Sequence, residues 1–296
     1  MTPVDPASWQ LVVPVKGGAG AKSRLHPPAG ISRADLAFAI ARDCLAAACS
    51  GMPRGHVRVV TSDPSVAEAA AELGALVVPD PGQGLNAAVA AGLAAVPVSR
   101  DAPEVDARPS RAALAVLLGD VPSLRAGDLA TALAAAAAYE RALVPDADGT
   151  GTVLLTSRTG ELTPAFGAGS AARHEHAGHH RLELDLPHLR TDVDDDRSLA
   201  AAAVLGLGPA TTACLAAAGA TLPDVQANVH TFDESTGAGS ALLDDGLQVS
   251  FPADVFARSA LRHLRPGQRI SIDLAADGRT VERLWIVGIG DDQRIG

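Results

Sequence analysis

The strongest constraint on the fold is a regular alternation of short apolar runs and helical segments through the first two hundred residues. The apolar runs are too short for helices and place apolar side chains in succession, which indicates strands covered on both faces. We expect strands at 10–14, 57–61, 75–78, 112–118, 142–144 and 152–156. We expect helices at 32–50, 64–73, 85–96, 126–139 and 198–205, with Ser32 and Asp63 capping the first two. The alternation predicts an α/β domain with a parallel sheet between layers of helices.

Beyond residue 205 the composition changes twice. Residues 208–224 are rich in Ala, Gly, Pro and Thr, which is typical of a linker. Short β-like runs follow, with Asp245-Gly246 as an apparent hairpin turn, and they indicate a small all-β barrel. We therefore predict a first domain at 1–207 and a second at 225–296. The polar, proline-containing segment 99–111 is expected to be a surface loop.

Composition and charge exclude several classes of protein. Hydrophobic residues at 47% and charged residues at 20% are ordinary for globular proteins and do not fit a disordered or collagen-like chain. We find no run of about 18 apolar residues and no signal-peptide pattern, so we expect a cytoplasmic protein without a membrane partner. Cys44, Cys49 and Cys214 lack metal-type spacing, which suits a reducing compartment. A net charge of -10 argues against nucleic acid as the main partner.

A glycine-rich segment, Lys16 to Leu25, follows the first expected strand. Among the 24 basic residues of the chain, only Lys16 and Lys22 are lysine, and both lie here. Glycines let backbone N–H groups approach a phosphate closely, and a compact ammonium acts on phosphate as a point charge. The segment matches neither the Walker A pattern nor the dinucleotide fingerprint. It predicts phosphate binding with help from Arg24, and chance placement of two lysines on a solvated loop is the alternative.

Three acidic residues are expected at one edge of the sheet. Asp120 follows the strand at 112–118, at the edge where open α/β sheets bind ligands. Asp192 and Asp194 follow another apolar segment, and their alternate spacing places both carboxylates on one side of an extended chain. Three converging carboxylates suit Mg²⁺, and a cationic loop opposite predicts metal-assisted phosphoryl or nucleotidyl transfer. The alternative is that the acidic run caps the following helix, a role that suits Asp195 or Asp196.

Four neighbouring histidines raise the possibility of zinc. They are His174, His176, His179 and His180. No second group of ligands accompanies them at a fixed spacing, and a solvent-facing helix end explains them equally well. We do not predict a zinc site.

Six motifs occur in the same order in a known family of enzymes. They are LVVPVKGGAGAKSRL (11–25), GQGLNAAV (82–89), LLGDVPSL (117–124), GTGTVLLT (149–156), PAFGAGSAARH (164–174) and RTDVDDDRSL (190–199). Over about residues 9–213 the chain resembles the guanylyltransferases of coenzyme F-420 biosynthesis that act on phosphoenolpyruvate or 2-phospho-L-lactate. The resemblance implies a Rossmann-like nucleotidyltransferase fold with a mixed sheet, as in molybdopterin guanylyltransferases. It also implies transfer of GMP from GTP to the phosphate of a three-carbon acid, with release of pyrophosphate.

The resemblance assigns roles to individual residues. It implies a metal site for Mg²⁺, with two ions, formed by Asp120, Asp192 and Asp194, and Asp120 is also among the implied catalytic residues. The other implied catalytic residues, which hold the GTP phosphates, are Lys16, Lys22 and Arg24. Contacts with the phosphorylated acid are implied for Thr152, Gly167 and Ser170. Contacts near the nucleoside are implied for Gln83, Gly84 and Asn86.

The tail resembles a cold-shock domain through HTFDESTGAGSALLDDG and LRPGQRISIDL. Where such domains stack bases on aromatic side chains, this chain has small residues at 237–241, and residues 226–296 carry three more acidic than basic residues. Both features disfavour binding of single strands. Two alternatives remain, namely a sugar-phosphate or molybdopterin-type nucleotidyltransferase and a nucleic-acid-binding regulator with a decayed enzyme domain. The sequence does not specify the acceptor acid or the oligomeric state.

Overall fold

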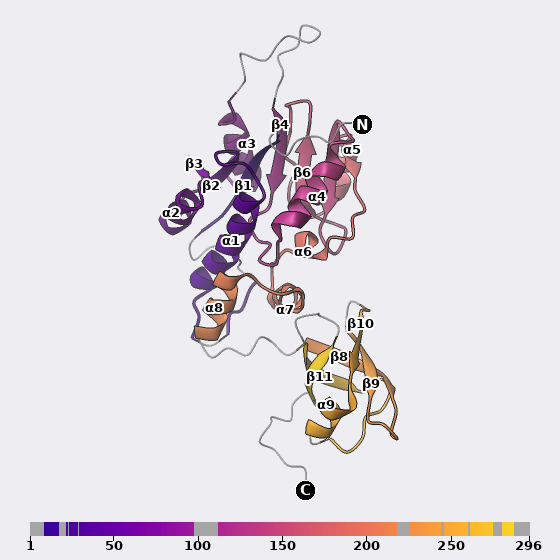
Figure 1. The fold of residues 1–296 in the computed structure, drawn as a ribbon. Coiled ribbons are helices and arrows are strands. Elements are labelled where there is room, and N and C mark those ends of the chain that lie inside the picture. The colour runs from indigo at the N-terminus through magenta and orange to yellow at the C-terminus, as the bar shows by residue number, and fades with distance from the viewer. Residues whose placement is uncertain are drawn as a thin grey trace. The chain divides into compact units, whose positions relative to one another are not determined.

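The computed structural model describes residues 9–17, 22, 24–28, 30–97, 112–217, 225–243, 246–259, 261–274 and 280–286 (Figure 1). The chain forms two compact units. The first contains Met1–Ala202 and Leu207–Ala220, and the second contains Ala203–Gly206 and Thr221–Gly296. The segment 99–111, where we expected a surface loop, lies outside the described residues.

A seven-stranded mixed sheet forms the centre of the first unit, in the order β3-β2-β1-β4-β6-β5-β7. The strands are β1 (Trp9–Pro14), β2 (Val57–Thr61), β3 (Leu76–Pro79), β4 (Ala113–Leu117), β5 (Arg141–Pro145), β6 (Thr152–Ser157) and β7 (His180–Arg181). The first four strands pair in parallel, whereas β6 is antiparallel to both β4 and β5. The sheet is therefore mixed. The prediction that every strand is covered on both faces is wrong for β3, because β3 is an edge strand and Leu76 and Val77 are exposed.

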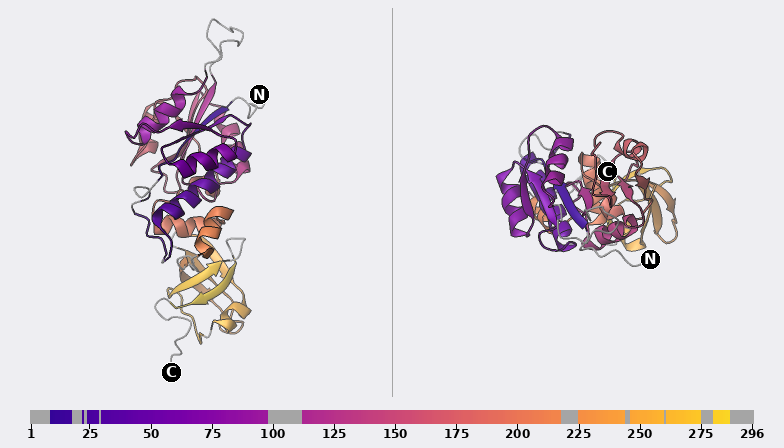
Figure 2. Two further views of the ribbon diagram at one scale, coloured as in Figure 1. Left: turned by 90° about the vertical axis from the view of Figure 1, so that its left-hand side faces the viewer. Right: turned by 90° about the horizontal axis from the view of Figure 1, so that it is seen from above.

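Helices cover both faces of this sheet (Figure 2). They are α1 (Arg33–Ser50), α2 (Pro64–Glu72), α3 (Leu85–Ala94), α4 (Ala126–Ala136), α5 (Ser170–His176) and α6 (Pro187–Arg190). Two more helices, α7 (Asp196–Leu205) and α8 (Pro209–Ala217), pack with α1 in a separate apolar cluster. Side chains of β1 alternate between the faces, since Leu11 and Val13 pack with α1, α2 and α4 while Val12 packs with α3 and α5. The two predicted caps are confirmed, because Ser32 Oγ accepts from Asp35 N and Asp63 accepts from Ser65 N.

Helix α8 corrects the predicted linker. Residues 209–217 lie inside the segment 208–224, yet they form a helix whose Thr211 and Leu215 are buried. Asp43 in α1 is only 5% exposed, and its carboxylate accepts hydrogen bonds from Ala210 N (2.9 Å) and Thr211 N (2.7 Å). This carboxylate satisfies backbone donors at the start of α8 that no helical carbonyl can reach. The first unit therefore extends through α8.

The second unit contains a five-stranded antiparallel sheet in the order β10-β9-β8-β11-β12. Its elements are β8 (Val225–Phe232), β9 (Gly239–Leu243), β10 (Gln248–Phe251), α9 (Ala253–Arg258), β11 (Arg269–Leu274) and β12 (Val281–Trp285). Apart from an isolated bridge between Ser250 and Thr280, the described strands do not close into the predicted barrel. Strands β9 and β10 do pair as a hairpin, but Asp245 of the expected turn lies outside the described residues.

Among the described residues, no single helix is long and apolar enough to cross a membrane. Helices α7 and α8 reach that length and composition only together, and they are bent by 119° relative to each other. Their side chains Leu199, Ala202 and Leu215 are buried in one apolar cluster with α1.

We expect a fragment ending at Asp224 to unfold at nearly the same temperature as the first unit of the full chain. A matched fragment ending at Gly206 should be less stable by roughly 2–5 kcal/mol, because Asp43 loses its two N–H donors and the apolar cluster loses Leu215. Thermal unfolding followed by circular dichroism measures both. Equal stability of the two fragments would show that α8 is dispensable.

Candidate active site

Three carboxylates meet at the end of β4. Asp120 follows that strand, and its carbonyl oxygen accepts a 2.9 Å hydrogen bond from Val193 N. Val193 is fully buried, so the segment on either side of it is held against the sheet edge. One oxygen from each of Asp120, Asp192 and Asp194 lies within 4.8 Å of the others. The predicted convergence is confirmed, although residues 192–194 are not part of a strand.

The end of β1 lies close enough to Asp120 to require a glycine beside it. A Cβ atom at Gly119 would meet the side chain of Val15 and would lie 3.0 Å from the carbonyl oxygen of Pro14. Any side chain there would push apart the ends of β1 and β4. The position of Asp120 at this edge therefore depends on the glycine that precedes it.

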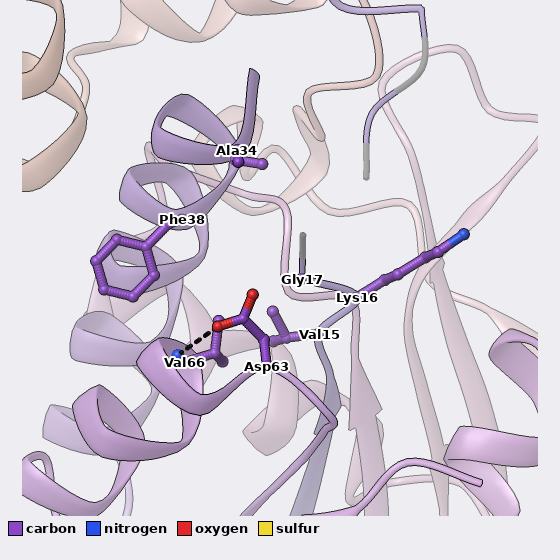
Figure 3. A pocket seen from close by; sticks show the side chains of 8 residues that line it. Val15, Lys16, Gly17, Ala34, Phe38, Asp63 and Val66 are labelled. Carbon is purple, nitrogen blue, oxygen red and sulfur yellow. Dashed lines mark hydrogen bonds between the residues drawn. The ribbon is translucent and has the colours of Figure 1, made fainter. Parts of the chain in front are cut away.

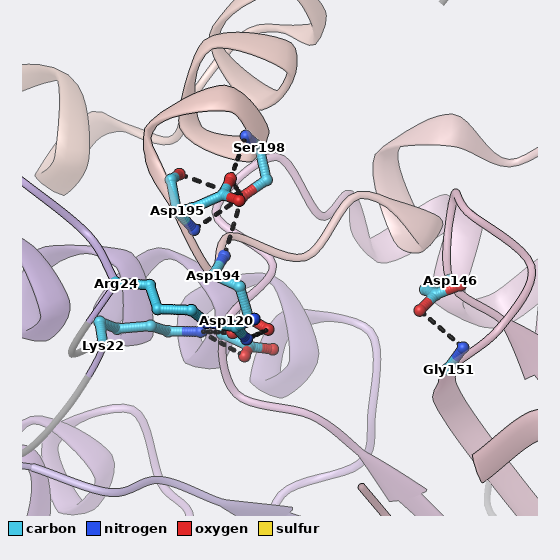
Figure 4. A network of polar contacts seen from close by, with 8 residues as sticks. All are labelled: Lys22, Arg24, Asp120, Asp146, Gly151, Asp194, Asp195 and Ser198. Atoms are coloured by element: carbon cyan, nitrogen blue, oxygen red, sulfur yellow. Dashed lines mark hydrogen bonds and ion pairs between the residues drawn. The ribbon is translucent and has the colours of Figure 1, made fainter. Parts of the chain in front are cut away.

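The acidic run also caps α7, as the alternative interpretation proposed. Asp195 Oδ1 accepts from Ser198 N at 2.9 Å, and Ser198 Oγ accepts from the backbone N–H groups of Asp194 and Asp195 (Figure 4). This reciprocal arrangement is a capping box. The hydrogen bond from Ser198 N lowers the pKa of Asp195. Asp195 therefore serves the helix, while Asp192 and Asp194 serve the cluster.

Two basic side chains lie against the carboxylates. The ammonium of Lys22 is 2.5 Å from Asp120 Oδ2 and 3.2 Å from Asp194 Oδ1, and Arg24 is 2.9 Å from Asp194 Oδ2 (Figure 4). Lys22 has a φ of 51°, a left-handed conformation that is uncommon for a residue other than glycine. Burial alone would lower the pKa of Lys22, but the carboxylates of Asp120 and Asp194 outweigh burial and raise it. Lys22 is therefore a fixed cation at the centre of the cluster.

Lys16 does not join this cluster through any contact that the structure describes. Lys16 lines a small pocket with Gly17, Phe38 and Asp63, and its exposed side chain points away from Asp63 (Figure 3). A Cβ atom at Gly17 would overlap the side chain of Asp63, so the chain passes α2 closely at that point. Residues 18–21 of the glycine-rich segment lie outside the described residues.

The acidic cluster has the donor chemistry of a divalent cation site. Burial, with the neighbouring carboxylates of Asp120 and Asp194, raises the pKa of Asp192 to about 7. In the described part of the chain, the buried Oδ1 of Asp120 has no hydrogen-bond partner. Carboxylate oxygens are the ligands that Mg²⁺ prefers, and a cation would both satisfy Asp120 and favour ionised Asp192. These residues therefore fit a magnesium site.

The residues expected at the phosphorylated acid lie on adjoining elements. Thr152 begins β6 and is buried, Gly167 has a φ of 119°, and Ser170 begins α5. His174 in α5 joins two of these elements, since its Nδ1 is 2.9 Å from Thr152 Oγ1. The structure therefore brings the three residues into one region.

Two of the histidines are not on a solvent-facing helix end. His174 is 0% exposed and His179 is 6% exposed, whereas His176 and His180 are exposed. The rings of His174 and His179 meet edge to face at 5.7 Å. The expectation of a solvent-facing end is thus wrong for His174 and His179.

The residues expected near the nucleoside lie before and at the start of α3. Gln83 is exposed, and Gly84 has a φ of 92° that favours glycine. Asn86 also forms hydrogen bonds within the protein that sequence reasoning missed. Its Oδ1 accepts from Phe166 N at 2.8 Å and its Nδ2 donates to Phe166 O at 3.2 Å. Asn86 therefore ties the start of α3 to the segment that precedes α5.

Comparisons with known proteins find a matching family and several similar proteins. The family model of the MobA-like NTP transferase domain matches residues 39–221. A phosphoenolpyruvate guanylyltransferase of Streptomyces coelicolor is 48% identical over 212 residues, which covers 70% of this chain and 96% of that protein. One from Streptomyces scabiei is 46% identical with the same coverage. A solved putative nucleotide-diphospho-sugar transferase from Desulfovibrio desulfuricans G20 is 18% identical, with a TM-score of 0.44 and coverage of 66% of this chain and 85% of that one.

We expect Asp192→Asn to stabilise the metal-free protein at pH 8 but not at pH 5. Because the pKa of Asp192 is raised, the folded state keeps a proton between about pH 4 and pH 7 that the unfolded chain releases, so wild-type stability falls as pH rises through that window. The gain at pH 8 should be roughly 2 kcal/mol, about half of what three pKa units would give without solvent screening.

Denaturant unfolding in the presence of a chelator measures this difference, with the exposed Asp185→Asn as the matched control. A constant difference between Asp192→Asn and the wild type from pH 5 to pH 8 would mean that Asp192 is ionised throughout.

Proposed function

Because this chain belongs to the MobA-like NTP transferase domain family, and within it to the phosphoenolpyruvate guanylyltransferases, we propose that it transfers GMP from GTP to the phosphate of phosphoenolpyruvate. The observation that carries the proposal is the cluster of Asp120, Asp192 and Asp194 with Lys22 at its centre. In the reaction, a phosphate oxygen of the acid attacks the α-phosphorus of GTP. The new P–O bond forms as the bond to the β-phosphate oxygen breaks, and pyrophosphate leaves.

Magnesium is the proposed cofactor, held by the three carboxylates at the sheet edge. When bound, it supplies positive charge against the phosphate oxygens during the transfer. Lys22 and Arg24 add fixed positive charge next to these carboxylates, where the pyrophosphate portion of GTP would lie. The exposed Lys16 is proposed as a further contact for these phosphates.

The acceptor acid is proposed to bind at Thr152, Gly167 and Ser170. The positive φ of Gly167 turns the chain directly before α5, so the backbone there can approach a small anion without a side chain between them. The proposed nucleoside contacts are Gln83, Gly84 and Asn86. The resemblance to the enzymes of coenzyme F-420 biosynthesis supports the same pathway for this chain.

For the second unit we propose a cold-shock-like fold that has lost single-strand binding. The order of its five antiparallel strands and its short helix support the fold. Phe251 is buried and Phe232 and Phe256 pack against the same apolar cluster, so these rings serve the core rather than a stacking surface.

The direct test of the proposed function is release of pyrophosphate from GTP with three acids assayed in parallel. The acids are phosphoenolpyruvate, 2-phospho-L-lactate and 3-phosphoglycerate. We expect phosphoenolpyruvate to support turnover, with a GMP adduct of the acid as the second product by mass spectrometry. Turnover with a sugar phosphate and with none of the three acids would contradict the proposal.

We expect Asp120→Asn and Asp194→Asn each to lower kcat by about 10²- to 10³-fold, since each keeps its shape and loses the charge that attracts the metal. The control is Asp185→Asn, which removes an exposed carboxylate elsewhere. Pyrophosphate release at saturating Mg²⁺ measures the loss. A variant that stays near the wild-type rate removes its residue from the proposed metal site.

The substitutions Lys22→Arg and Arg24→Lys should have unequal effects on catalysis. Lys22 is 13% exposed and lies between two carboxylates, so Lys22→Arg places a wide planar group where a compact ammonium fits. We expect it to lower kcat/KM for GTP by about tenfold or more, the effect of roughly 1.4 kcal/mol. Arg24→Lys is the matched control, because Arg24 is 73% exposed and has room for either group. Equal effects of both exchanges would contradict a specific need for lysine.

A further inference from the structure

His174 is a buried residue whose two ring nitrogens are both hydrogen-bonded. Nε2 lies 3.0 Å from Ala165 N, and Nδ1 lies 2.9 Å from Thr152 Oγ1. A backbone N–H can only donate, so Nε2 must accept and carries no proton. In the neutral ring the proton is then on Nδ1, which donates to the oxygen of Thr152. The hydrogen-bond network thus assigns one tautomer to His174.

This tautomer fixes how the Thr152 hydroxyl is used. Its oxygen already accepts from the imidazole, so the hydroxyl proton cannot point toward His174 and is available to another acceptor. Thr152 is 2% exposed, and rotation of its side chain would break the bond to His174. A hydroxyl whose proton is directed in this way is a suitable donor to an anionic oxygen.

The second hydrogen bond of His174 acts on the segment that precedes α5. Ala165 is held on both sides, because its N–H donates to His174 and its carbonyl accepts from Arg173 Nε (3.0 Å) and Nη2 (2.9 Å). The next residue, Phe166, is held by the amide of Asn86. Gly167 follows directly, so its position depends on these bonds.

The surroundings of His174 favour the neutral ring. Burial is the main cause that lowers the pKa of His174 to about 4, and the neighbouring His179 and Arg173 lower it further. The ring of Phe166 lies edge to face with the imidazole at 5.1 Å. The pKa of His179 is itself lowered by burial, with Arg141 adding to the effect, so this neighbour is also neutral near pH 7.

We propose that His174 is the positioning residue of the acceptor pocket: its imidazole directs the Thr152 hydroxyl toward the phosphorylated acid and holds Ala165 so that Gly167 and Ser170 face the same ligand. This inference rests on the proposed function, since it assumes that the acid binds at Thr152. It assigns His174 no contact with the reacting atoms.

Two substitutions separate the two hydrogen bonds. In His174→Asn the shorter amide can still donate to Thr152 but does not reach Ala165. In His174→Gln the longer amide can still accept from Ala165 but does not offer the donor at the position of Nδ1. Thr152→Val removes the hydroxyl at nearly constant shape, and Thr152→Ser keeps the hydroxyl.

The full-length chain is assayed for steady-state KM with phosphoenolpyruvate and with GTP. We expect His174→Gln and Thr152→Val each to raise the KM for the acid by about tenfold. Neither should change the KM for GTP by more than about twofold. The double variant should be no worse than either single one, because both changes remove the same interaction. Thr152→Ser restores the hydroxyl and should recover most of the affinity for the acid that Thr152→Val loses.

Equal losses for GTP and the acid, or full additivity in the double variant, would overturn the proposal in favour of a structural role. If wild-type protein shows no turnover with GTP and phosphoenolpyruvate, the proposed function fails instead. The nitrogen NMR spectrum of the His174 ring in the wild-type protein tests the assigned tautomer without any substrate. We expect a proton on Nδ1 and none on Nε2 from pH 8 down to about pH 5.5, and a proton on Nε2 in that range would also overturn the proposal.

Discussion

Three carboxylates within 4.8 Å of one another repel, and the arrangement of this site follows from how the chain offsets that repulsion. Lys22 lies between two of them, and the strained left-handed backbone at that residue is tolerated because the ion pairs hold its side chain. The third carboxylate, Asp192, has no basic partner of its own among the described contacts, and burial beside the other two carboxylates raises its pKa. The cluster is thus only partly neutralised, which is the condition under which a divalent cation binds well.

The opposite side of the site is held by a different kind of interaction. Around Ala165 and Phe166, neutral hydrogen bonds from His174 and Asn86 fix backbone groups, and Arg173 adds bonds to carbonyl oxygens. These bonds do not depend on pH near neutrality, since His174 is held neutral. The carboxylate cluster therefore depends on charge, whereas the segment around Ala165 is held by hydrogen bonds that do not change with pH near neutrality.

Local signals were sufficient to predict most of the first unit. Ser32 and Asp63 act on their own helices, and the carboxyl ends of strands meet at one edge, so the caps and the meeting of Asp120 with Asp192 could be predicted. Helix α8 could not be predicted, because its sequence shows no clear apolar periodicity. Its cap, Asp43, is 167 residues away along the chain. The edge position of β3 likewise depends on the order of strands, which the run of apolar residues at 75–78 does not encode.

His174 shows the same limit at the site. In the sequence it stands in a group of histidines near a helix end, and nothing local distinguishes the buried ring from its exposed neighbour His176. Its partners Thr152 and Ala165 come from a strand and a loop that only the folded chain brings together. Roles that depend on such distant partners require the tertiary structure.

The paired hydrogen bonds between Asn86 and Phe166 have a consequence for the thermodynamics of the two substrates. They join the first turn of α3 to the segment before α5, so a shift of either backbone must break these two bonds or move the other backbone with it. If the nucleotide binds one segment and the acid binds the other, as we propose, the two binding equilibria are linked through this pair. Linkage is reciprocal, so whatever factor the nucleotide adds to the affinity for the acid, the acid must add to the affinity for the nucleotide.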